Sequence, residues 1–101
     1  MREIELPLPS NHNRREAQRA IDAAARECRL TITLRGTLAK FPGCIHWHLK
    51  NGRERGTMEI TFWPKERRAW FSIQSGRRAP WIVPMTGKLR ESVTANSPAR
   101  R

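Results

Sequence analysis

Large apolar side chains occupy every second position in three consecutive segments of the chain, residues 44–50, 57–63 and 68–74. Because successive side chains of a β-strand point to opposite faces, this spacing predicts three strands that each bury one face. A chain with this pattern is constrained to an antiparallel meander with one apolar side. The apolar positions are Ile45, Trp47 and Leu49, then Met58, Ile60 and Phe62, then Ala69, Phe71 and Ile73.

The loop between the first two segments, residues 51–56, is compatible with two turns. Asn51-Gly52 is a strong signal for a two-residue hairpin turn, but that turn would place Leu49 opposite Glu54. A six-residue loop instead places Leu49 opposite Met58 and keeps all the apolar positions on one side. Burial of one face fixes register more strongly than turn preference does, so we expect the six-residue loop.

A fourth strand is predicted over residues 30–41, where apolar residues again alternate with polar ones. We expect it to end in a tight turn centred on Pro42-Gly43. The expected pairs across this turn are Phe41 with Cys44, Leu38 with Trp47, and Gly36 with Leu49.

A helix is predicted over residues 13–28. Asn13 and Glu16 have the spacing of a capping box, and apolar residues follow at three- and four-residue intervals. This stripe is mostly alanine, so the helix can approach a sheet closely. The stripe comprises Ala17, Ala20, Ile21, Ala24, Ala25 and Cys28, while Arg15, Arg19, Asp22 and Arg26 fall on the opposite face, which we interpret as solvated.

The two ends of the chain are less regular. Pro7 and Pro9 remove backbone donors, so residues 1–9 can form only an edge strand or an extended arm. A short helix is expected around residues 86–93, and residues 95–101 are predicted to be a disordered basic tail. The predicted fold is therefore α+β: a single domain, residues 1–94, in which an N-terminal helix packs on a four-stranded antiparallel meander as a two-layer sandwich.

The charge balance restricts the class of partner. The chain has 101 residues, with 20 Lys or Arg against 9 Asp or Glu and a net charge of +11. Residues 1–29 carry six basic against five acidic residues, whereas residues 30–101 carry fourteen against four. The positive field therefore belongs to the later part of the chain, and it favours an anionic partner such as nucleic acid.

The expected compartment and the exclusion of a cofactor domain follow from features that the sequence lacks and from its length. No apolar run approaches the ~18–20 residues needed to cross a bilayer, and no signal peptide is recognisable at the N-terminus. Two cysteines without a secretory signal are expected to be reduced, so we predict a cytoplasmic protein. A chain of 101 residues is also too short for a separate cofactor domain, and no cofactor is predicted.

The second face of the predicted sheet is the expected binding surface. It places three aromatic residues near one corner, with basic residues at both ends and in the adjoining loops. Bases stack on exposed rings while cations meet phosphates, so this pattern predicts binding of DNA or RNA. The candidate residues are the aromatic Phe41, Trp63 and Trp70 and the basic Arg35, Lys50, Arg53, Arg55, Arg68, Arg77 and Arg78.

Two alternatives use the same aromatic corner. The segment Trp81-Ile82-Val83 would form a second small core if it folded over these rings. Two copies of the chain would bury the same residues if the faces packed together, giving a homodimer or a protein-interaction module. The order of a helix, antiparallel strands and a short helix resembles double-stranded RNA-binding domains in topology alone, with an additional strand.

The residues Cys44, His46 and His48 share one side of a predicted strand, with Glu59 opposite His48. Thiolate, imidazole and carboxylate are zinc ligands, but Cys44 and His48 would lie ~13 Å apart, so the spacing does not give a closed ligand set. His46, His48 and Glu59 are also candidates for acid–base cleavage of a phosphodiester. A His48–Glu59 cross-strand ion pair beside a solvent-facing His46 is the preferred interpretation, and we predict neither a metal nor an enzyme.

Overall fold

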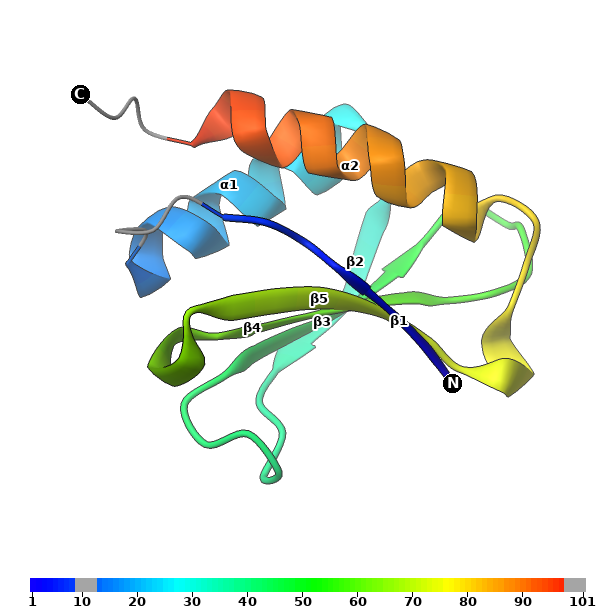
Figure 1. Ribbon diagram of the computed structural model, residues 1–101. Helices are drawn as coiled ribbons and strands as arrows, with labels where there is room; N and C mark the ends of the chain where they lie inside the picture. The colour runs from blue at the N-terminus through cyan, green and yellow to red at the C-terminus, as the bar shows by residue number, and fades with distance from the viewer. Residues whose placement is uncertain (9–12, 98–101) are drawn as a thin grey trace.

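The computed structural model describes residues 1–8 and 13–97. Five antiparallel strands form one sheet in the order β1-β5-β4-β3-β2, and two helices cover one side of it (Figure 1). The elements are β1 (Arg2–Glu5), α1 (Arg14–Glu27), β2 (Thr31–Gly36), β3 (Ile45–Lys50), β4 (Met58–Trp63), β5 (Arg68–Ile73) and α2 (Ile82–Asn96), with short 3-10 turns at Pro64–Glu66 and Ser75–Arg77.

The α+β class with an antiparallel sheet is confirmed, but the predicted arrangement needs correction. The sheet has five strands rather than four, because β1 adds to the edge of β5 and precedes the first helix. The sequence is compatible with either an edge strand or an extended arm over residues 1–9. In the structure, Arg2–Glu5 form the edge strand. Leu6 continues the pairing by donating to Ala69, and Pro7, which has no N–H, follows directly.

The meander of β3, β4 and β5 has the predicted register. Trp47 lies opposite Ile60, which lies opposite Phe71, and Leu49 lies opposite Met58 across the six-residue loop. These side chains are almost fully buried beneath the helices. Burial of one face therefore decided the register, as expected, against the preference of Asn51-Gly52 for a tight turn.

Helix α1 begins and packs as its sequence predicts. The Asn13 side chain accepts a hydrogen bond from the Glu16 N–H at 2.8 Å, and the Glu16 carboxylate accepts one from the Asn13 N–H at 3.4 Å. The stripe facing the sheet is at most 1% exposed, and it is formed by Ala17, Ala20, Ile21, Ala24 and Ala25. Small side chains here allow the helix to lie close over Trp47, whose indole N–H donates to Asp22 at 2.9 Å.

Strand β2 contradicts the prediction for residues 30–41. It ends at Gly36, and an irregularity between Ile32 and Leu34 shifts its register, so that Ile32 lies opposite Leu49 and Arg35 opposite Trp47. An inserted residue reverses the faces of every later position in a strand. The expected pairs of Leu38 with Trp47 and Gly36 with Leu49 are therefore wrong. The tight turn centred on Pro42-Gly43 does form, because the Cys44 N–H donates to Phe41 O at 3.0 Å, but a loop and not a strand leads into it from Gly36.

The C-terminal helix is longer than predicted. Helix α2 begins at Ile82 rather than near residue 86, and it buries Ile82, Leu89 and Val93. Pro84 does not prevent this, because a proline in the first turn removes an N–H that has no partner within the helix. The helix continues to Asn96, two residues into the segment predicted as a tail, and residues 98–101 lie outside the described residues.

The two helices are also joined by polar contacts. Glu27 accepts hydrogen bonds from Ser92 at 2.5 Å and from Asn96 at 3.0 Å, both on α2. These bonds hold the pKa of the Glu27 carboxyl below its usual value, with the Ser92 contact contributing most. Residues 81–97 therefore pack on the helical side and do not cover the aromatic corner.

The C-terminal end of α1 generates a test of backbone strain. Arg29 adopts a left-handed conformation, φ 59°, while its N–H bonds to Arg26 and the Leu30 N–H bonds to Ala25. This is the Schellman arrangement, in which glycine is favoured because a Cβ atom is disfavoured in left-handed backbone. We expect Arg29→Gly to raise the free energy of unfolding by up to about 1 kcal/mol in denaturant titrations.

Arg29→Ala is the matched control, because it removes the same long side chain but keeps the Cβ atom. It should give no comparable gain. An equal gain in both variants would show that the arginine side chain, and not the backbone conformation, is the destabilising element.

Candidate functional site

The side of the sheet opposite the helices carries a row of polar residues from neighbouring strands. The alternation of β3 places His46 and His48 on this side, and the register sets Glu59 of β4 beside His48 and Thr61 beside His46. Ser72 and Trp70 of β5 continue the two rows. The same register that buries the apolar core therefore brings two imidazoles and a carboxylate together.

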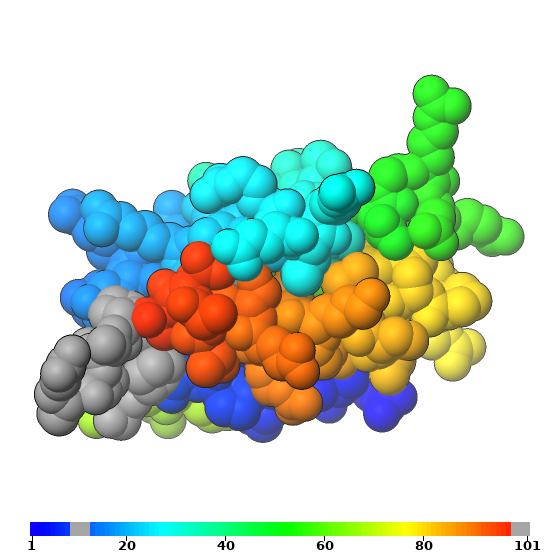
Figure 2. Space-filling model, turned by 90° about the horizontal axis from the view of Figure 1, so that it is seen from above, coloured from blue at the N-terminus to red at the C-terminus, as the bar shows by residue number. Residues whose placement is uncertain are grey.

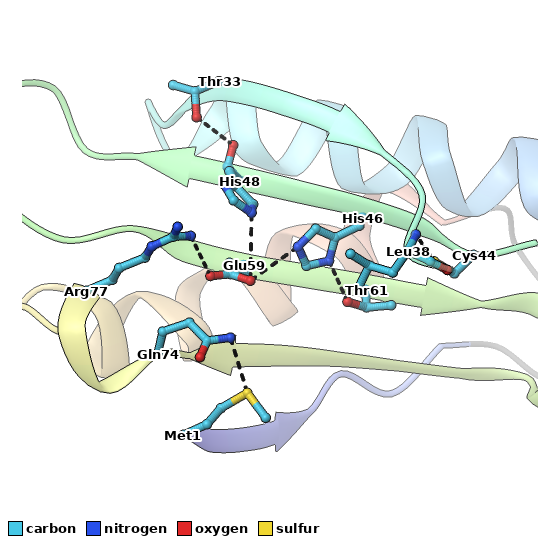
Figure 3. A network of polar contacts seen from close by, with 10 residues as sticks. All are labelled: Met1, Thr33, Leu38, Cys44, His46, His48, Glu59, Thr61, Gln74 and Arg77. Carbon is cyan, nitrogen blue, oxygen red and sulfur yellow. Dashed lines mark hydrogen bonds and ion pairs between the residues drawn. The ribbon is translucent and has the colours of Figure 1, made fainter. Parts of the chain in front are cut away.

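The two imidazoles converge on one carboxylate oxygen (Figure 3). His46 Nε2 lies 3.2 Å from Glu59 Oε1, and His48 Nε2 lies 3.7 Å from the same atom. Their rings meet edge to face with centroids 5.1 Å apart. We call His46, His48 and Glu59 the histidine–glutamate cluster.

Two further residues hold this cluster in place. Arg77 donates to Glu59 Oε2 at 3.0 Å, so the second carboxylate oxygen is occupied and Oε1 is left to the histidines. Thr61 Oγ1 lies 2.7 Å from His46 Nδ1 and fixes the orientation of that ring. The Glu59 residue is only 4% exposed, which makes a charged partner such as Arg77 necessary for its carboxylate.

The cluster is reached from a surface hollow of about 530 Å³. The 3-10 turn after β5 supplies Gly76 and Arg77 to its wall, and Leu38 from the loop after β2 lies against it with Gln74. His48 keeps 22% of its side chain exposed, whereas His46 keeps 6%. The expectation of a solvent-facing His46 is therefore wrong, because the ring packs against Thr61 and Glu59. A solute entering the hollow therefore meets His48 first.

Cys44 does not belong to the cluster. It is buried, and its Sγ accepts a hydrogen bond from the Leu38 N–H at 3.3 Å. It meets Phe41 across the predicted Pro42-Gly43 turn, where the Cys44 N–H donates to Phe41 O at 3.0 Å, although neither residue belongs to a strand. The thiol thus stabilises the 37–44 loop.

The aromatic corner forms a small packed cluster within the chain. Phe41 reaches back from the 37–44 loop and packs with its centroid 5.0 Å from Trp63 and 5.1 Å from Trp70. Trp70 is only 3% exposed, and the Trp63 indole N–H donates to Pro42 O at 3.0 Å. A second small core therefore exists, but the 37–44 loop makes it, not the segment 81–83. In this conformation Trp70 offers no open ring for a base.

Three of the predicted basic contacts are engaged inside the chain. Arg35 lies on the helical side and forms an ion pair with Asp22 at 2.9 Å, because the shift in β2 moved it to that face. Lys50 donates to Gly56 O at 2.8 Å. Arg68 lies over the Trp70 ring, 4.8 Å from its centroid, and pairs with Glu5 of β1.

The remaining basic candidates lie on two loops that the fold brings together. The Thr57 N–H donates to Arg77 O at 3.0 Å, and the Trp81 indole donates to Arg55 O at 2.7 Å. Gly56 allows this approach: its φ is +96°, and a Cβ there would lie 2.6 Å from that of Ala79. The 51–56 loop and the 75–80 connector sit side by side at one end of the molecule (Figure 2).

We call the four arginines of these loops, Arg53, Arg55, Arg77 and Arg78, the arginine edge. All four residues are exposed. Among residues 1–8 and 13–97, only Arg77 of the four forms an ion pair. The sequence placed these arginines in loops, but their proximity depends on the long-range contact at Gly56 and was not predictable from local patterns.

Comparisons with protein families, with characterised proteins and with solved structures found no match for this chain. Within the described residues, neither helix has the length and apolar character needed to cross a membrane. The interpretation of the site therefore depends on its own geometry.

The buried position of His46 generates a test by titration. Burial lowers the pKa of His46 below its usual 6.5, while the charge of Glu59 opposes this shift and His48 and Arg77 support it. Since the neutral form is favoured in the folded state, the unfolded state binds the proton first as pH falls. The stabilisation is complete above about pH 6.5 and is lost as pH falls from there through the lowered value.

We expect the ring protons of His46 in NMR spectra to titrate with a midpoint below 6.5, and unfolding titrations to show falling stability over the same range. His46→Gln assigns the resonance by its loss. A midpoint above 6.5 would show that attraction to Glu59 outweighs burial.

Proposed function

We propose that the protein is a small nucleic-acid-binding module that contacts phosphates through the arginine edge. One observation carries this proposal. The Thr57–Arg77 and Trp81–Arg55 hydrogen bonds hold two arginine-bearing loops together. A backbone held in this way presents Arg53, Arg55 and Arg78 from a fixed support. Such preorganisation reduces the entropy lost when the side chains bind a ligand.

The chemistry of the edge fits a phosphate backbone. Guanidinium groups bind phosphate oxygens through paired hydrogen bonds, and each contact releases counterions from the polyanion. Glu54 lies within the same loop, but it accepts a hydrogen bond from Asn51 at 3.0 Å and not from an arginine. Arg53 and Arg55 therefore keep their donors available for an external anion.

The aromatic contribution differs from the one first expected. Phe41, Trp63 and Trp70 pack against one another, so their rings contribute to stability in the free protein. Phosphate contacts then carry most of the affinity, and they do not discriminate between sequences. A homodimer or protein-interaction module using this corner would contact the half-buried Phe41 and Trp63, since Trp70 is buried.

Substitution of two arginines of the arginine edge tests the proposal. We expect Arg53→Gln with Arg55→Gln to weaken binding of a short duplex or single strand and to reduce the dependence of log K on log salt by about 1 to 2. The Trp81 hydrogen bond uses the main-chain oxygen of Arg55, so the loop contact survives both changes. Fluorescence anisotropy of a labelled oligonucleotide at several salt concentrations measures the slope.

Arg15→Gln with Arg19→Gln is the matched control. Both residues are exposed on α1, so these substitutions remove the same charge at a position away from the arginine edge. It should leave the slope close to that of the unchanged protein. An equal loss in both double variants would assign binding to net charge alone, and a loss only in the control would move the interface to α1. No binding at low salt would reject the proposal.

A further inference from the structure

We propose that the histidine–glutamate cluster is a binding site for a divalent transition-metal ion, with Zn²⁺ the best match. His46 Nε2, His48 Nε2 and Glu59 Oε1 supply the ligand atoms, which all lie within 4.8 Å of one another. Metal binding here does not depend on the proposed nucleic-acid binding, since the ligands lie on the sheet and not on the arginine edge.

The distances are close to those of a zinc site. With bonds of about 2.1 Å, ligand atoms of a tetrahedral site lie about 3.4 Å apart. The separations from Glu59 Oε1 are 3.2 Å to His46 and 3.7 Å to His48. Closure requires one imidazole to approach the other, because the three ligand atoms spread over as much as 4.8 Å. His48 is the residue free to make this approach, because it is the more exposed of the two.

The surroundings have the form of a second ligand shell. Thr61 Oγ1 is 2.7 Å from His46 Nδ1, so with the metal on Nε2 the Nδ1–H donates to the hydroxyl. Arg77 binds the distal oxygen of Glu59 at 3.0 Å and orients the carboxylate with Oε1 toward the histidines. Hydrogen bonds of both kinds fix ligands in characterised metal sites.

The placement of the three ligand atoms also favours a bound cation. One nitrogen of each imidazole faces the same carboxylate oxygen of Glu59. A cation placed among the three atoms uses the lone pairs of both rings and the negative charge of Glu59 together.

The donor set selects among metals. Two imidazoles and one carboxylate suit zinc and other first-row transition metals, whereas Mg²⁺ and Ca²⁺ prefer sites built of oxygen. Three protein ligands leave a further position, which faces the hollow bounded by Leu38, Gln74 and Gly76. Water or a small anion from solvent is the expected occupant of that position.

Calorimetric titration of the full chain with Zn²⁺, after removal of metals by a chelator, tests the site. We expect one equivalent to bind, with no competition from millimolar Mg²⁺, and His48→Ala to abolish this binding. His48 is chosen because it is the least buried ligand, so its loss should not prevent folding. Thr61→Val should weaken binding by about 10- to 100-fold through the ring of His46.

Two controls separate the site from other zinc ligands of the chain. Cys28→Ser removes the less buried of the two thiols, and His12→Ala removes the histidine outside the cluster. Both should bind Zn²⁺ as the unchanged protein does. Cobalt(II) in place of zinc should give a visible spectrum without the intense ultraviolet band of a cobalt–thiolate bond.

NMR of the unchanged protein gives an answer even if a variant fails to fold. On addition of Zn²⁺, the ring signals of His46 and His48 should shift together at one equivalent. The proposal is wrong if Zn²⁺ leaves these signals unmoved, or if His48→Ala binds with undiminished affinity. It is also wrong if Cys28→Ser or His12→Ala removes the binding.

Discussion

Burial of one face of the β3–β4–β5 meander is the constraint on which the rest of the structure depends. Trp47, Ile60 and Phe71 align across the three strands and pack beneath the helices. A shift of one residue in any strand would expose this row, so the register has no low-energy alternative. The polar side inherits the same register, and the contact between His48 and Glu59 is therefore a consequence of core packing.

The elements set by local periodicity were predictable from the sequence. Helix α1 with its Asn13–Glu16 cap, the three meander strands and the His48–Glu59 pairing all follow from spacing and turns. The misplaced elements depend on contacts between distant segments. The irregularity after Ile32 leaves no mark in the apolar pattern, and β1 becomes a strand only through pairing with β5. Helix α2 is longer than predicted, since it begins before Pro84 and a proline is tolerated in the first turn.

The 37–44 loop shows how one shift in register rearranges the side chains of a whole surface. Once β2 ends at Gly36, Phe41 is released from strand pairing and packs between Trp63 and Trp70. Trp70 is then buried while Phe41 and Trp63 stay half-buried, and Leu38 comes to lie beside the histidines. The candidate binding groups of this face are therefore the histidine–glutamate cluster and the arginine edge, and not the aromatic rings.

Arg77 links these two regions through different atoms. Its main-chain oxygen accepts the Thr57 N–H and closes the contact between the two loops, while its guanidinium neutralises the buried Glu59. A change of this side chain would leave a buried carboxylate without its cation, and such a loss is strongly destabilising. Its effects on anion and metal binding would therefore be mixed with effects on folding. Within the described residues, no buried carboxylate depends on the charge of Arg53, Arg55 or His48 in this way. Substitutions at these positions therefore report separately on the arginine edge and on the histidine–glutamate cluster.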